Sequence, residues 1–182
     1  LRSRAHREAV LEAIADGTVD AIARMDNTYL VIQGPPGSGK TYTSAHAIVS
    51  LLDKGKRVGV MSMSHKAINN LLKKVEEVAA ERGVNFSGIK KSSDAEDYLN
   101  GTVIVDSEKN EEACSGDHGL IGGTAWLFSR PEMDQKLDYL FIDEAGQVSL
   151  ADIVATGLSA KNIVLVGDQM QLGQPTKGTP PR

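Results

Sequence analysis

The residues best suited to chemistry form one glycine-rich run, Gly34-Pro35-Pro36-Gly37-Ser38-Gly39-Lys40-Thr41, which fits the pattern G-x-x-x-x-G-K-S/T. Its glycines allow a tight turn in which backbone N–H groups point inward toward an anion. We expect Lys40 to reach the β- and γ-phosphates of a nucleotide and the Thr41 hydroxyl to bind Mg²⁺. The run therefore predicts a phosphate-binding loop.

A second candidate is the acidic pair Asp143-Glu144, which directly follows the four apolar residues 139–142 at the end of the expected strand 137–142. We expect the first carboxylate to hold Mg²⁺ together with the loop threonine. The second carboxylate is suited to orient and deprotonate a water that attacks the γ-phosphate. Nucleotide kinases and many GTPases share the glycine loop but need no second acid here. The pair therefore favours an enzyme that hydrolyses ATP, with ATP and Mg²⁺ as cofactors.

Apolar runs and helical patterns alternate along the chain, and these elements must position the two candidates. We expect strands at 28–33, 57–62, 102–105, 119–124, 137–142 and 163–166. Helices are expected after the glycine loop as far as Gly55, from the turn at 64–66 to Arg82, and at 151–158. The alternation predicts an α/β fold with a mostly parallel sheet. The polar signatures fall at the carboxyl ends of strands, where ligands bind in such sheets.

Three segments outside these motifs have simpler patterns. Residues 1–27 are expected to form a helical lead-in whose first helix, 5–15, ends at Gly17. Residues 84–118 are rich in acids and poor in large apolar side chains, so we expect an acidic surface excursion there. The run Trp126-Leu127-Phe128 is expected to pack after a buried strand.

Composition limits the class of protein. The 182 residues are enough for one domain with a substantial core. A net charge of −4 argues against tight, independent binding of nucleic acid, because such binders are usually basic. No apolar run approaches the ~18 residues of a membrane span. The single Cys114 excludes an internal disulfide and is compatible with a reducing compartment, so we expect a cytoplasmic protein.

Five segments in order resemble the motifs of superfamily 1 helicases, in the branch that moves 5′ to 3′. They are the glycine loop (motif I), Ser62 to Leu71 (motif Ia), Gly122 to Phe128 (the threonine segment after motif Ia), Asp143-Glu144-Ala145-Gly146-Gln147 (motif II) and Leu165 to Leu172 (motif III). The chain is also similar to the helicase part of bacterial proteins in which a RecB-like nuclease region precedes the helicase. The resemblance covers residues 28–178.

The resemblance implies roles for individual residues. Mg²⁺ would be held by Thr41 and Asp143, and Glu144 would be the general base. Asp168 and the loop from Gly34 to Thr41 would contact ATP, and Gln147 and Gln171 would sense its γ-phosphate. Ser64, His65 and Thr124 would contact the phosphates of a single strand. A polar residue in a turn is the alternative for both glutamines, and a helix-start residue is the alternative for His65.

The resemblance also implies an architecture. Residues 1–182 would form one RecA-like P-loop NTPase domain, with helices on both faces of the sheet and the motif III strand between those of motifs I and II. Such enzymes bind ATP between two RecA-like domains, and the motifs of the second are absent from this chain. We therefore expect the first motor domain of a DNA or RNA helicase, nearly inactive alone, with single strands and a second motor domain as partners. The alternative is a stand-alone P-loop ATPase switch that does not act on nucleic acid.

Overall fold

The computed structural model describes residues 16–168, and one seven-stranded sheet organises them. Every strand pair is parallel, and the order is β1-β7-β6-β2-β5-β3-β4. The strands are β1 (Tyr29–Gln33), β2 (Val58–Met61), β3 (Gly88–Lys91), β4 (Ile104–Ser107), β5 (Leu120–Gly123), β6 (Leu137–Ile142) and β7 (Ala160–Gly167). The predicted parallel α/β fold is confirmed, including the motif III strand β7 between β1 and β6.

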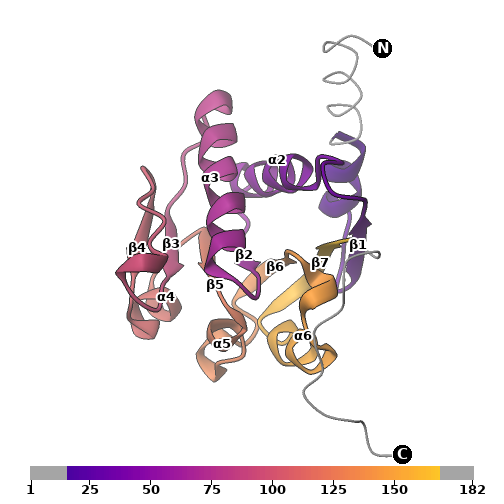
Figure 1. Ribbon diagram of the computed structural model, residues 1–182. Coiled ribbons are helices and arrows are strands. Elements are labelled where there is room, and N and C mark those ends of the chain that lie inside the picture. The colour runs from indigo at the N-terminus through magenta and orange to yellow at the C-terminus, as the bar shows by residue number, and fades with distance from the viewer. Residues whose placement is uncertain (1–15, 169–182) are drawn as a thin grey trace, which may run out of the picture.

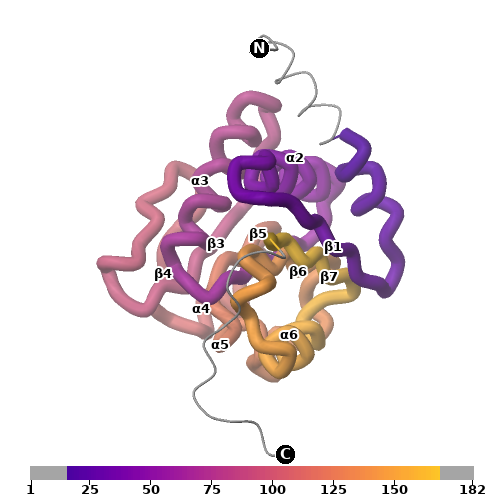
Figure 2. Tube along the Cα trace, turned by 45° about the vertical axis from the view of Figure 1, so that its right-hand side comes forward, coloured from indigo at the N-terminus to yellow at the C-terminus, as the bar shows by residue number. Residues whose placement is uncertain are grey.

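Helices cover both faces of this sheet, as predicted. They are α2 (Lys40–Asp53), α3 (His65–Arg82), α4 (Asn110–Ser115), α5 (Ala125–Phe128) and α6 (Leu150–Gly157), with short 3₁₀ helices η1 (Ala95–Asp97), η2 (Pro131–Met133) and η3 (Ala145–Gln147). Helices α2 and α3 lie together on one side of the sheet, and α5 and α6 lie on the other (Figure 1). Figure 2, turned by 45°, shows the same arrangement, with α2 and α3 in one layer and α5 and α6 in the other.

The core is divided by the sheet into two clusters of buried apolar side chains. Side chains of α2 and α3, such as Ile48 and Leu71, pack against Val60 and Phe141 in the first cluster. The second cluster lies under α5 and includes Met61. Because successive side chains of a strand point to opposite faces, β2 contributes Val60 to one cluster and Met61 to the other. Because apolar side chains cover both faces of the sheet, all four residues of the central strand β2 are buried.

Strand β1 differs from its prediction as a buried strand. None of its residues is buried, and Tyr29 and Val31 are 69% and 55% exposed. In the part of the chain that the structure describes, β1 pairs only with β7 and forms an edge of the sheet. An apolar run predicts a strand, but the burial of that strand depends on whether other elements cover it. Among the described residues, no strand pairs with the free edge of β1.

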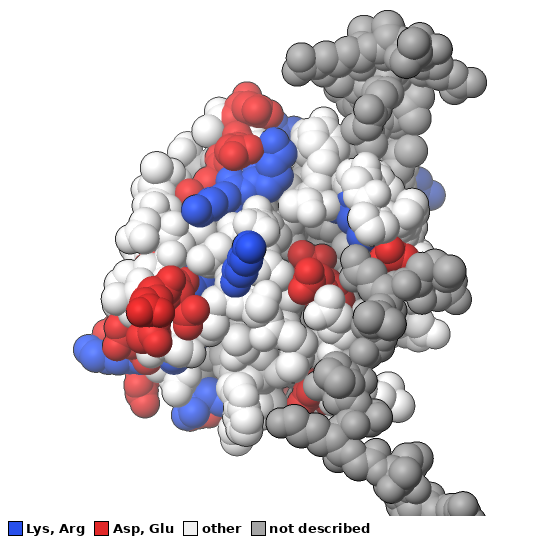
Figure 3. Space-filling view, viewed as in Figure 1, with Lys and Arg blue, Asp and Glu red and all other residues white. Residues whose placement is uncertain are grey.

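The acidic segment 84–118 extends the sheet through two strands, whereas the sequence predicted one. Most of its acids are exposed, and acidic side chains gather over the end of the sheet formed by β3 and β4 (Figure 3). Strand β3, with sequence Gly-Ile-Lys-Lys, was missed because it has no apolar run. Its Lys90 is nevertheless fully buried, and Nζ donates to Ser92 Oγ at 2.7 Å and to the carbonyl oxygen of Asp97.

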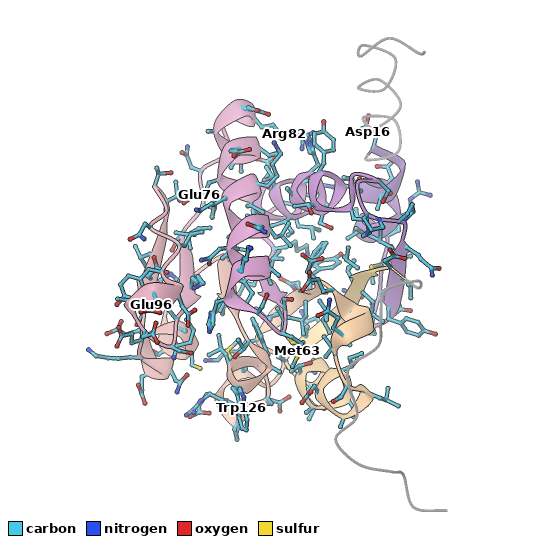
Figure 4. All side chains as sticks on the ribbon, in the orientation of Figure 1. Asp16, Met63, Glu76, Arg82, Glu96 and Trp126 are labelled. Atoms are coloured by element: carbon cyan, nitrogen blue, oxygen red, sulfur yellow. The ribbon has the colours of Figure 1, made fainter. Side chains whose placement is uncertain are left out.

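Two carboxylates fasten this extension. Glu76 of α3 accepts hydrogen bonds from the backbone N–H groups of residues 102–104 at 2.7–3.2 Å. Asp106 of β4 accepts from the N–H groups of Leu99 and Asn100, each at 2.9 Å. The two carboxylates thereby satisfy backbone N–H groups of the segment 99–104, which leads into β4. Figure 4 shows Glu76 on the side of α3 that faces this extension.

Three smaller predictions concern the ends and the core. Residues 16–23 are helical, so the prediction that Gly17 ends a helix is wrong, and the helix predicted at 5–15 lies outside the described residues. Trp126 is 86% exposed and does not pack in the core, whereas Leu127 and Phe128 are each 1% exposed. No helix among residues 16–168 is long and apolar enough to cross a membrane.

Candidate nucleotide-binding site

The glycine loop joins β1 to α2 with the backbone that its sequence predicts. Gly37 and Gly39 have φ angles of 75° and 86°, in the left-handed region that other residues rarely adopt. A Cβ on Gly34 would lie 2.5 Å from Ser38 Oγ, so a side chain at this position would require Ser38 to shift. No side chain caps the N-terminus of the 14-residue helix α2. Its first N–H groups and the positive end of its dipole are therefore free to meet an anion.

Lys40, the first residue of α2, is folded back onto the loop. Its ammonium donates to the carbonyl oxygens of Gly34 at 2.5 Å and Pro35 at 3.0 Å. These contacts hold the charge next to the space above the loop. A bound phosphate would offer the ammonium a charged acceptor in place of one of the carbonyls, and hydrogen bonds to charged acceptors are the stronger ones.

The sheet order brings the loop and the acidic pair together. Strand β7 separates β1 from β6, and the N–H group of Gly34 donates to the carbonyl oxygen of Gly167 at 3.3 Å. A cavity of about 160 Å³, which we name the nucleotide cavity, lies at the carboxyl ends of these three strands. Its lining consists of Lys40, Thr41, Ala67, Asn70, Asp143, Glu144, Gly167 and Asp168. Five of the predicted site residues therefore share one small polar cavity.

The acidic pair has a constrained geometry. The N–H group of Asp143 donates to the carbonyl oxygen of Met61 at 2.8 Å, which fixes the end of β6 against β2. Glu144 has a φ of 53°, a left-handed conformation that costs energy in a residue other than glycine. Its N–H group donates to Asp143 Oδ1 at 3.0 Å. The turn therefore orients both carboxylates toward the cavity that they line.

Burial raises the pKa of Asp143 above its ordinary value of 3.8, and the charge of Glu144 adds to this rise. The hydrogen bond from the N–H group of Glu144 and the positive charge of Lys40 oppose the rise. A partly desolvated carboxylate between an ammonium and a second carboxylate is suited to receive a cation. A bound cation would offset the cost of ionising Asp143, and the metal-binding role of Asp143 stays a prediction.

The remaining predicted nucleotide contacts divide into three cases. Asp168 lines the cavity. Gln147 ends η3, where its N–H group donates to the carbonyl oxygen of Glu144 at 2.8 Å, and it is not among the lining residues. This placement matches the alternative of a polar residue in a turn, and its role toward the γ-phosphate stays a prediction. Gln171 lies outside the described residues.

Two lining residues, Ala67 and Asn70, were missed by sequence reasoning. Both belong to the first turns of α3, three residues apart on one side of the helix. Asn70 is a polar side chain beside the buried apolar positions of α3, which is the only sequence signal that could have marked it. The first turns of α3 therefore form one wall of the nucleotide cavity.

The residues predicted to contact a single strand lie at a second place. Ser64 caps α3 by accepting a hydrogen bond from the N–H group of Ala67 at 3.1 Å, which is a structural role. His65 Nε2 lies 3.2 Å from Ser93 Oγ and 3.4 Å from Asp97 Oδ2. Burial lowers the pKa of His65, and nearby Lys90 lowers it further. Their contact with phosphate stays a prediction.

His65 and Thr124 nevertheless share a cavity, which lies at the carboxyl ends of β2 and β5. It measures about 490 Å³ and is separate from the nucleotide cavity, with no lining residue in common. The structure thus brings two of the three predicted strand contacts together. It also shows that this cavity adjoins α5 and α6, whose residues contribute to its wall.

No arginine among residues 16–168 lines the nucleotide cavity. Arg57 precedes β2 at the opposite end of the sheet, where it donates to the carbonyl oxygen of Gly116 at 3.4 Å. Arg130 forms an ion pair with Glu132 at 2.8 Å. The described residues therefore supply one cation to this cavity, Lys40.

Comparisons with known proteins were made for the whole chain. The family described as "AAA domain" matches residues 16–182. The "DNA replication ATP-dependent helicase/nuclease JHS1" of Arabidopsis thaliana is 29% identical over 153 residues, which cover 79% of this chain and 11% of that protein. The "DNA replication ATP-dependent helicase/nuclease DNA2" of Saccharomyces cerevisiae is 28% identical over 170 residues, which cover 85% and 10%. The chain thus spans about a tenth of the length of these relatives.

One solved structure has the same fold over almost the whole chain. It is a nuclease-deletion mutant of the type ISP restriction-modification enzyme LlaGI in complex with a DNA substrate mimic. The match has a TM-score of 0.56 and 12% sequence identity, and it covers 97% of this chain and 18% of that one. At this identity the match concerns the fold alone.

Proposed function

The chain belongs to the AAA domain family, and from this premise we propose that it couples ATP hydrolysis to movement along single-stranded nucleic acid within a longer protein. Its relatives are helicases, and it is homologous to part of them. The observation that carries the proposal is the cavity that unites Lys40, Thr41, Asp143 and Glu144 at the ends of three adjacent strands. These four side chains are the minimum for binding a nucleoside triphosphate and directing water at it.

The donor set of this cavity fits Mg²⁺ and the phosphates of ATP. Thr41 and Asp143 offer hard oxygen donors, and Mg²⁺ is commonly held by one or two protein oxygens together with phosphates and water. Bound Mg²⁺ would neutralise charge that develops on the phosphate oxygens. Lys40 and the uncapped N–H groups of α2 would bind the phosphates from the other side.

We assign the proton transfer to Glu144. A water held at its carboxylate would lose a proton to the glutamate as it attacks the γ-phosphate. The left-handed backbone of Glu144 turns the chain sharply after Asp143, so that adjacent residues serve two tasks. Gln147 and Gln171 are proposed to sense the γ-phosphate, and Asp168 is proposed to contact the nucleotide.

The partners are proposed from the relatives and from the charges of the cavity. The named relatives are DNA replication enzymes, and the LlaGI structure contains a DNA substrate mimic. We propose single-stranded DNA or RNA as the track, with contacts at Ser64, His65 and Thr124. A second RecA-like domain is proposed to supply arginines to the γ-phosphate, since no described arginine lines the cavity. We also propose a cytoplasmic location, with which the single buried thiol of Cys114 agrees.

The test uses the longer protein and measures phosphate release with and without single-stranded DNA and RNA. We expect release to be stimulated by one of the strands, and Glu144→Gln to reduce it by on the order of 10²- to 10⁴-fold while ATP still binds. Glu77→Gln, on the exposed face of α3, is the matched control and should turn over normally. Normal turnover in Glu144→Gln would show that another residue is the base. Release that no nucleic acid stimulates would favour the alternative of an ATPase switch.

A further inference from the structure

The cavity shared by His65 and Thr124 at the carboxyl ends of β2 and β5 has further lining groups that the proposed function does not use. It lies between the start of α3, the loop after β3, and helices α5 and α6, and its volume is about 490 Å³. That volume lies within the range of sites for small organic groups, ~300–1,000 Å³. Its lining consists of Met63, His65, Ser93, Thr124, Ala125, Trp126, Ser129, Asp152, Ala155 and Thr156.

Trp126 is the unusual member of this lining. It is 86% exposed, although tryptophan is highly buried on average and is the only one in this chain. Met63 is also exposed, at 41%. Figure 4 shows both on the same side of the molecule, with Trp126 projecting outward from α5. A large aromatic face and a flexible thioether thus stand open to solvent at the mouth of one cavity.

The other lining groups are polar and almost uncharged. His65, Ser93, Thr124 and Ser129 present hydroxyl and ring nitrogen groups, and no lysine or arginine of residues 16–168 lines the cavity. The carboxylate of Asp152 accepts a hydrogen bond from Ser149 Oγ at 2.7 Å. Such a lining suits an uncharged group better than a phosphate, which needs cations or free N–H groups, so the strand contact expected of His65 and Thr124 would here be with a base in place of a phosphate. It suits a flat, uncharged group with apolar faces and hydrogen-bonding edges.

We propose that this cavity receives one nucleobase of the single strand and that Trp126 is the surface on which the base stacks. The proposal rests on the proposed function, because it specifies where the strand's bases lie once nucleic acid is bound. A nucleobase has the required flat apolar faces, and Thr124 and Ser93 offer groups to its edges. Stacking on an aromatic side chain tolerates any base, as a motor that moves along varied sequences requires.

The position of the cavity connects it to the nucleotide site. Within two turns, helix α3 contributes His65 to the cavity proposed for the base, the base cavity, and Ala67 and Asn70 to the nucleotide cavity. The turn that carries Glu144 leads through η3 into α6, which contributes Asp152 and Thr156 to the base cavity. Two continuous elements therefore link a stacked base to the groups around the γ-phosphate.

The experiment uses the 182-residue chain at low salt, where weak binding of a strand is strongest. Oligodeoxythymidylate is compared with an oligomer of the same length and charge whose sugars carry no bases. We expect the thymidylate to quench the emission of Trp126, the only tryptophan, and the abasic oligomer to leave it unchanged. By anisotropy of labelled oligomers, Trp126→Ala should weaken thymidylate binding roughly tenfold, as expected for loss of one stacked base.

Two variants and the abasic oligomer separate the possible results. Trp126→Phe should restore most of the affinity, and Leu150→Ala, another exposed apolar change that lies outside the cavity, should leave it unchanged. Equal binding of both oligomers, with unchanged emission and no effect of Trp126→Ala, would overturn the base cavity and leave the proposed function standing. If neither oligomer binds the chain, the base cavity is overturned, whereas the proposed function is tested separately by phosphate release from the longer protein.

Discussion

Lys40 donates hydrogen bonds to two carbonyl oxygens of its own loop, those of Gly34 and Pro35. A nucleotide must replace these neutral acceptors, and it can do so because phosphate oxygens are charged. We expect Lys40→Ala to cost roughly 2 kcal/mol of nucleotide affinity, on the order of 30-fold, without loss of the fold. Titration with a fluorescent ATP analogue measures the affinity, and circular dichroism monitors the fold.

Lys54→Ala, at the exposed C-terminal end of the same helix, is the matched control and should bind nucleotide normally. If Lys40→Ala is folded and binds nucleotide as tightly as the unmodified chain, the glycine run is not a phosphate-binding loop.

We expect ionisation of the Asp143 carboxyl to lower the free energy of unfolding at neutral pH. Because its pKa is raised in the folded state, the folded protein holds this proton more tightly than the unfolded chain does. Stability is therefore lost as the pH rises from 3.8 through the raised pKa, and the loss persists above it. Asp143→Asn, which cannot ionise, should unfold at a higher temperature than the unmodified chain at pH 7 without Mg²⁺. The difference should close as the pH falls toward 3.8.

Asp138 provides a control of opposite sign. Burial would raise its pKa, but the Arg57 N–H group and Lys161 bond to the carboxylate and the net effect is a lowered pKa. Asp138→Asn should therefore lower the unfolding temperature at pH 7. Thermal unfolding followed by circular dichroism over a series of pH values measures both variants. A lower unfolding temperature for Asp143→Asn at pH 7 would contradict the proposed electrostatics of the site.

At the scale of elements, Glu76 determines whether the loop before β4 stays attached to α3. Its carboxylate accepts hydrogen bonds from three successive N–H groups, those of residues 102–104. Glu76→Ala removes the acceptor, so we expect a loss of about 2 kcal/mol in the free energy of unfolding. Hydrogen–deuterium exchange should become faster at residues 102–104. Glu77→Ala, whose partner is the exposed Lys74, should change neither quantity. Unchanged exchange in Glu76→Ala would show that the loop is held by other contacts.

At the scale of the whole molecule, the described residues form an incomplete catalyst. Phosphoryl transfer depends on stabilising charge on the γ-phosphate oxygens, and an added arginine typically contributes a factor of ~10³–10⁵. The described arginines are engaged elsewhere or lie away from the cavity: Arg24, Arg57, Arg82 and Arg130. We therefore expect the 182-residue chain to bind Mg-ATP but to turn it over well below ~1 s⁻¹, the low end of ordinary enzymes.

Steady-state phosphate release, with and without single strands, measures this turnover. Rates near or above ~1 s⁻¹ would refute the prediction. Loss of such activity in Arg130→Ala would then show that this arginine leaves Glu132 and reaches the nucleotide.

The sequence by itself determined the class of fold and predicted five of the side chains that line the nucleotide cavity. The glycine run needs left-handed backbone at Gly37 and Gly39, and only glycine adopts it readily. The segment 137–142 forms β6 with the predicted bounds, and its last four residues are apolar because both faces of a central parallel strand are buried. Parallel strands place their carboxyl ends at one edge, but Lys40 and Asp143 share a cavity because only β7 lies between β1 and β6 in the sheet.

The tertiary structure decided which residues are covered. An apolar run at 29–33 and the aromatic Trp126 both predicted burial, yet β1 is an edge strand and Trp126 is open to solvent. Lys90 belongs to the segment 84–118 that was expected to be a surface excursion, yet it is fully buried and its ammonium donates to Ser92 Oγ. Local sequence records the preference of each side chain, whereas burial depends on contacts between segments far apart in the chain. The same reason explains why the wall of α3 at the nucleotide and the cavity beside Trp126 were found only in three dimensions.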